Sequence, residues 1–145
     1  MSDLISGDTE QKGEGGRGYV DALKALHAEA NRVKDDVEEI KSSLEESYPA
    51  EALTNLSRRF ETISENFTNY TLININMFYE ILHRSPTRLE AANAIAGQAL
   101  TVAKLFAAYA RNPDSYNALD SRHEITKLIA QLVNLVNAAP GETDS

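Results

Sequence analysis

The strongest candidates for chemistry in this sequence are Glu80 and His83, which lie three positions apart. A Glu-x-x-His step on one helix is how di-iron bundles direct two ligands toward a shared metal centre. Such a centre needs a second step of this kind and further carboxylates from other helices, and the sequence contains no second Glu-x-x-His. We therefore interpret Glu80 and His83 as polar residues near a helix end, and we expect no metal and no cofactor.

The other candidates for catalysis are isolated residues. His27 and His123 have no second ligand three or four positions later in the chain. Ser121 lies near His123, but neighbouring positions on a helix point in different directions, and no glycine-rich elbow accompanies them. The glycines of residues 13–18 follow no strand and so form no phosphate loop. Cysteine is absent, which excludes thiolate chemistry. The sequence predicts a protein that is not an enzyme.

Charge and hydropathy argue against two classes of partner, nucleic acids and membranes. A net charge of −8 argues against binding to nucleic acid, because that affinity comes first from Lys and Arg on phosphates. The most apolar stretch, 91–110, is interrupted by polar residues and rich in alanine, which argues against a membrane span. The N-terminus lacks the apolar core of a secretory signal, so a cytoplasmic location is the default expectation, with a nuclear one as the alternative. A protein partner or a second copy is the expected ligand.

Glycine and proline mark the limits of one expected domain. Five of the seven glycines fall within residues 1–18 among Ser, Asp, Glu and Lys, which is a composition typical of a flexible tail. Residues 140–145 begin with Pro-Gly and continue with acids, so they also predict a tail. A helical bundle domain is expected over residues 19–139.

Two long helices with matched heptad seams are predicted over residues 19–47 and 50–83. In both, apolar side chains alternate between steps of three and four, which is the 3.5-residue period of a coiled-coil seam. Pro49 separates them, so the two helices should form an antiparallel hairpin. The two seams are Tyr19, Leu23, Leu26, Ala30, Val33, Val37, Ile40 and Leu44, and Leu53, Leu56, Phe60, Ile63, Phe67, Tyr70, Asn74, Met77 and Ile81.

Two shorter helices should complete the bundle. One should begin at Ser85-Pro86, where Ser is the N-cap and Pro the first helical residue, and end at Asn112-Pro113. Its small residues at 92, 96, 99 and 103 should let a neighbouring backbone approach closely. The other should begin near Ser121, which forms a capping box with Glu124.

The position at which these shorter helices dock determines how much of the two seams stays uncovered and free to bind a partner. A second apolar stripe at Leu72, Ile75, Tyr79 and Leu82 indicates that this half of the second helix is bundle core, so the shorter helices should dock there. The rest of the hairpin would then extend beyond the bundle and hold a partner helix. The expected partner-binding residues are Val33, Val37, Ile40, Leu44, Leu53, Leu56, Phe60, Ile63 and Phe67.

Asn74 allows two interpretations. It occupies a seam position, where a buried amide fixes register or oligomeric state by requiring a polar partner. Alternatively, Asn74 is solvated at the edge of the bundle, and Ile73 or Ile75 takes the core position.

Two stretches resemble small all-helical subunits of the Mediator head module. They are Arg58-Arg59-Phe-Glu-Thr-Ile-Ser-Glu-Asn-Phe-Thr and the alanine-rich helix that runs on to Asn117 and Arg122. The resemblance implies a helical subunit of a larger assembly. It covers a minor part of the chain and leaves the long first helix unexplained, so no residue's role is taken from it.

The sequence therefore predicts an all-α four-helix bundle built on a long antiparallel, coiled-coil-like hairpin. Its predicted function is that of a non-enzymatic interaction module: a subunit, adaptor or chaperone of an assembly, or a protein that associates with itself through the hairpin. The alternative hypothesis is a bundle that binds a small ligand or metal near Tyr70, Asn74, Tyr79, Glu80 and His83.

Overall fold

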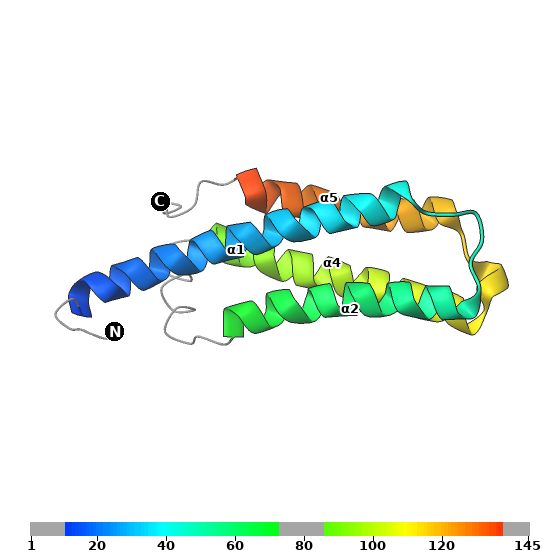
Figure 1. Cartoon of the computed structure of the whole chain (residues 1–145), viewed down its shortest axis with the longest axis horizontal. Helices are drawn as coiled ribbons and strands as arrows, with labels where there is room; N and C mark the ends of the chain where they lie inside the picture. Colours follow the sequence, from blue (N-terminus) through cyan, green and yellow to red (C-terminus); the bar gives the residue numbers. More distant parts are fainter. Residues whose placement is uncertain (1–10, 73–85, 138–145) are drawn as a thin grey trace.

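A computed structural model describes residues 11–72 and 86–137 of the chain, and these residues form helices and their connections without any strand. Successive helices run in opposite directions (Figure 1). The predicted all-α four-helix bundle is confirmed. Its elements are α1 (Gln11–Ser42), α2 (Ala50–Leu72), α4 (Pro86–Arg111), the 3-10 turn η1 (Pro113–Ser115) and α5 (Ala118–Asn137).

The helices of the bundle do not approach one another equally. Within the described residues, α2 lies closest to α4, α1 packs along α5, and α4 also packs against α5, whereas the backbones of α1 and α2 stand further apart. α1 and α2 run antiparallel, as the predicted hairpin requires (Figure 1). Their seams do not pair only with each other, because both contribute to one core that α4 and α5 complete.

The close approach of α2 to α4 is produced by small residues on both helices. Alanines 92, 96, 99 and 103 of α4 are buried, as their spacing predicts. On α2, Ser57 Oγ donates a hydrogen bond to the Ala103 carbonyl oxygen at 2.7 Å, and Ser64 Oγ donates one to that of Ala96 at 2.8 Å. A serine hydroxyl can reach a neighbouring helix backbone only if the two helices lie close together, so these bonds hold α2 against α4.

α1 ends at Ser42, earlier than Pro49 alone predicts. The hydroxyls of Ser42 and Ser43 both donate to the Glu39 carbonyl oxygen, at 3.1 and 2.8 Å, in the way that serine side chains satisfy helix ends. The connection over residues 43–49 then packs Tyr48 edge-on against Tyr116, with ring centroids 5.3 Å apart.

Tyr116 ties this connection to the one between α4 and α5. Its hydroxyl donates to the Glu45 carbonyl oxygen at 2.9 Å. Burial, with a smaller contribution from Tyr48, raises the pKa of Tyr116 to about 12, so the hydroxyl keeps the proton that it donates at neutral pH. Both connections therefore lie at the same end of the bundle (Figure 1).

Three other observed helix boundaries can be compared with those predicted from the sequence. α4 begins at Pro86 and ends at Arg111, as predicted. α1 begins at Gln11, so residues 11–18 belong to a helix and not to the predicted tail. Gly costs about 1 kcal/mol in a helix, which weakens a helix but does not by itself end one. Residues 140–145 lie outside the described residues.

The predicted capping box at the start of α5 is wrong. The helix begins at Ala118, and its N-cap is Asn117, whose Oδ1 accepts a hydrogen bond from the Asp120 amide at 2.9 Å. Ser121 is buried and donates its hydroxyl to the Asn117 carbonyl oxygen. The Glu124 carboxylate accepts a hydrogen bond from the side-chain amide of Gln98 on α4, which lowers the pKa of Glu124.

The prediction that the 33–67 part of the hairpin extends beyond the bundle is also wrong, because α4 and α5 cover it. The stripe where the shorter helices were expected to dock stays a prediction, since Ile75, Tyr79 and Leu82 lie outside the described residues. A heptad stripe shows that a helix buries one face but does not say which helix covers it. Here the stripes of α4 and α5, through residues such as Ile95, Phe106 and Ile125, meet the α1 and α2 seams in one core.

Candidate protein interface

The structure places most of the expected partner-binding residues inside the protein. Of the nine, seven are buried and the other two, Leu44 and Leu56, are partly buried and packed against the core. The leftover seam surface that motivated the prediction is therefore missing from this stretch. The buried seven are Val33, Val37, Ile40, Leu53, Phe60, Ile63 and Phe67. Partner binding itself stays a prediction, and Ile40 and Ile63 line the groove described below.

The residues of the alternative ligand site fall mostly outside the described part of the chain. Asn74, Tyr79, Glu80 and His83 lie within residues 73–85, and Tyr70 is described by its backbone alone. Both interpretations of Asn74 therefore stay predictions. Among the residues that the structure does describe, there is no group of three or more His, Cys, Asp or Glu able to hold a metal. In the same residues, no helix combines the length and apolarity that a membrane crossing requires.

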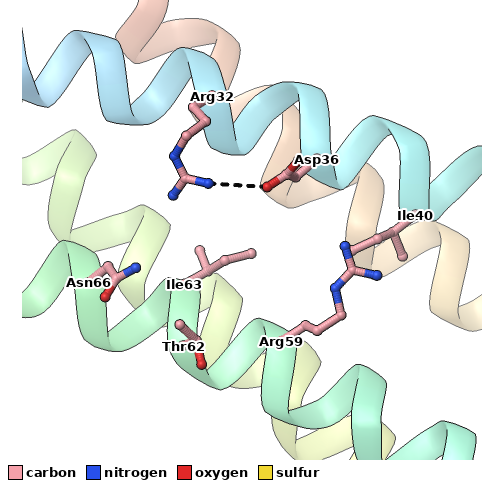
Figure 2. A pocket seen from close by; sticks show the side chains of 7 residues that line it. All are labelled: Arg32, Asp36, Ile40, Arg59, Thr62, Ile63 and Asn66. Atoms are coloured by element: carbon pink, nitrogen blue, oxygen red, sulfur yellow. Dashed lines mark hydrogen bonds and ion pairs between the residues drawn. The ribbon is translucent and has the colours of Figure 1, made fainter.

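A groove opens between α1 and α2, the pair of helices whose backbones stand apart. In Figure 2, Arg32 extends from α1 toward α2 and Ile63 from α2 toward α1. The same groove is also lined by Asp36, Thr62 and Asn66. Its volume is about 220 Å³. Ile40 and Ile63 supply apolar surface between the two rims, and both side chains also belong to the core. The groove is therefore an opening in the side of the bundle, with an apolar floor and polar edges.

Each rim of the groove carries an arginine, and the two arginines differ in whether they are paired with a carboxylate. On α1, Arg32 bonds to Glu29 at 2.7 Å and to Asp36 at 3.3 Å, and the hydrogen bond to Glu29 is the main cause of the raised pKa of Arg32. On α2, Arg59 is exposed and extends toward α1 (Figure 2). Within the described chain it has neither a hydrogen bond nor an ion pair. Arg59 is thus a cation available to an incoming carboxylate.

Comparison with protein families, with curated proteins and with solved structures gave no match. The groove itself is the guide to function.

Sequence reasoning did not find this groove. A signal for it was present, because Ser57, Ser64 and the alanines of α4 favour a close α2–α4 contact. In this bundle α2 lies close to α4, and its backbone stands further from α1.

His27, a buried ionisable residue of α1, supports a prediction about the pH dependence of stability. Its side chain is 8% exposed, and its Nε2 has no hydrogen-bond partner. Burial first, and then the charge of Arg88 on α4, lower the pKa of His27 below its ordinary value of 6.5, against the effect of a hydrogen bond to the Val136 backbone. The folded protein therefore favours the neutral ring.

Acidification should destabilise the protein through His27. The unfolded chain takes up the proton at a higher pH than the folded protein, so stability should fall as pH drops below 6.5 toward the lower folded pKa. We expect a lower urea midpoint at pH 5.5 than at pH 7.5, and a smaller difference in His27→Gln. The control is His123→Gln, at an exposed histidine. Equal pH dependence in wild type and His27→Gln would contradict the assignment.

Proposed function

We propose that this protein is a non-enzymatic helical interaction module, and that it holds a helix of its partner over the groove between α1 and α2. The observation that supports this most directly is the groove itself, an apolar floor with an unpaired cation at its rim. Ile40 and Ile63 form the base of this opening, where 4% of Ile40 and 9% of Ile63 is exposed. The space above this base, between α1 and α2, is where a partner side chain would insert.

The dimensions of the groove favour a protein partner over a small molecule. Small-molecule pockets are clefts of roughly 300–1,000 Å³ that enclose most of their ligand. This groove, of about 220 Å³, is smaller and open on one side. It suits the insertion of one or two side chains from a helix that lies across it, as in other helix-in-groove complexes.

The charges at the rim define what that helix should carry. An apolar side chain would contact Ile40 and Ile63, and an Asp or Glu one turn away would pair with Arg59. Thr62 and Asn66 line the same rim and can bond to polar groups at the edge of the contact. The proposed partner segment is therefore an amphipathic helix with an acidic residue beside its apolar stripe.

Two groove variants and one matched control test this proposal. Arg59→Glu reverses the cation, and Thr62→Trp fills the groove from an exposed position. Arg58→Glu makes the same charge change on the neighbouring exposed arginine, which does not line the groove. In quantitative affinity capture from the protein's own cells, we expect a partner that Arg58→Glu retains and both groove variants lose by about tenfold or more.

The oligomeric state identifies the source of the helix. Should light scattering show a dimer that Arg59→Glu and Thr62→Trp dissociate, the helix belongs to a second copy. The proposed function would be contradicted if the protein were a monomer and if wild type and all three variants captured the same proteins. Equal urea midpoints for the three variants would show that any loss of binding does not come from unfolding.

A further inference from the structure

A second hollow, separate from the α1/α2 groove, lies where the end of α1 meets the first turns of α5. Its volume is about 370 Å³, and it is lined by Lys41, Leu119, Asp120, Arg122, His123 and Thr126. The groove described above faces α2, whereas this hollow faces α5, so α1 separates the two surfaces.

Leu119 gives this hollow an apolar surface that the fold does not use. Its side chain is 72% exposed, and the next most exposed large apolar side chain in the described chain, Leu100, is 39% exposed. A single exposed leucine is ordinary on protein surfaces, so it carries no argument alone. Its position is informative because of the charges that surround it.

Three cationic or ionisable basic side chains line the hollow with Leu119. Within the described chain, the side chains of Lys41, Arg122 and His123 form no hydrogen bond and no ion pair. The sequence as a whole carries a net charge of −8, whereas Lys41 and Arg122 give this hollow two positive charges against one acid. Asp120 is the one acid among the lining residues. Basic side chains around an exposed apolar one complement a ligand that is acidic and apolar at once.

We propose that this hollow is a docking surface for an acidic peptide segment with an apolar side chain next to its carboxylates. The apolar side chain contacts Leu119, and the carboxylates pair with Lys41 and Arg122. Nucleic acid fits less well, since three basic residues neutralise few phosphates and Asp120 repels them. A membrane surface fits less well because stable attachment needs more apolar area than one leucine supplies.

Fluorescence anisotropy with three labelled peptides tests the chemistry. The probe alternates Asp with Leu, a second peptide replaces every Asp with Asn, and a third replaces every Leu with Ser. We expect only the Asp-Leu peptide to bind, and to shift the backbone amide NMR signals of Lys41 and of residues 119–126. Arg122→Glu and Leu119→Ser should each weaken binding by about tenfold. Leu100→Ser and Arg58→Glu are the matched controls and should change it less than about twofold.

Several results would overturn the proposal. Binding of the Asn-Leu peptide as tight as that of the Asp-Leu peptide would show that charge is not recognised. Absence of binding, or equal binding by all variants, would remove the site. Flotation with phosphatidylserine vesicles that depends on Leu119 and Arg122 would assign the surface to a membrane, and a dimer dissociated by Leu119→Ser would assign it to a second copy. None of these results bears on the α1/α2 groove, whose variants are separate.

Discussion

Replacing Phe60 with alanine is expected to lower the free energy of unfolding by about 3–5 kcal/mol. Phe60 is fully buried, and its ring stacks on Phe106 with centroids 6.0 Å apart and planes 6° from parallel. Truncation removes the transfer energy of the ring and leaves a cavity between α2 and α4. Because a domain of this size has a total stability of about 5–15 kcal/mol, the loss should be a large part of it. Urea unfolding followed by far-ultraviolet circular dichroism measures it.

This substitution also separates the two interpretations of the heptad seam. If Phe60 were a partner-binding residue on a free seam, its replacement would leave the stability of the isolated protein nearly unchanged. Thr62→Ala, at an exposed position on the same helix, is the control and should stay within about 0.5 kcal/mol of wild type. A similarly small effect for Phe60→Ala would restore the seam as a candidate interface and contradict its assignment to the core.

The sequence was sufficient to predict the helices and most of the core. The period of 3.5 identified Val33, Val37 and Phe60 as residues of buried faces, because apolar spacing reports which side of a helix avoids water. The free seam surface on which their assignment to a partner interface was based is missing for a related reason. Periodicity shows that a face is covered, but not whether another helix of the same chain or of another chain covers it.

Helix ends were predictable only where one signal dominated. Pro86 and the Asn112-Pro113 pair fix the limits of α4, since proline starts a helix well and cannot continue one. At the start of α5, Asn117 and Ser121 are both good caps. The cap at Asn117 adds a turn of helix before Ser121. Glu124 accepts a hydrogen bond from Gln98 on another helix, and local sequence cannot show such a contact.

The groove was not predictable from the two helices that border it alone. It depends on how close α2 lies to α4, and therefore also on residues of a helix that does not line it. The hollow at Leu119 is a similar case. Lys41 and Arg122 are far apart in sequence, and the packing of α1 along α5 places them in one surface.

Replacing Ala99 with leucine is the direct test of what sets the spacing of α2. Ala99 is fully buried and lies between Ala96 and Ala103, whose carbonyl oxygens accept the hydrogen bonds from Ser64 and Ser57. A leucine there would force the helices apart and stretch both bonds. We expect unfolding to cost about 1–3 kcal/mol less, with the upper end reached if both serine bonds are lost. Ala108→Leu, at an exposed position on the same helix, is the matched control.

The Ala99→Leu substitution should also change partner binding without touching the groove. If the α2–α4 contact fixes the distance between α1 and α2, then a partner lost by Arg59→Glu should also be lost by Ala99→Leu and retained by Ala108→Leu. Capture at a temperature where Ala99→Leu is still folded by circular dichroism excludes simple unfolding. Retained binding in a destabilised Ala99→Leu would show that the groove does not depend on this contact. The small residues of α4 would then contribute to stability alone.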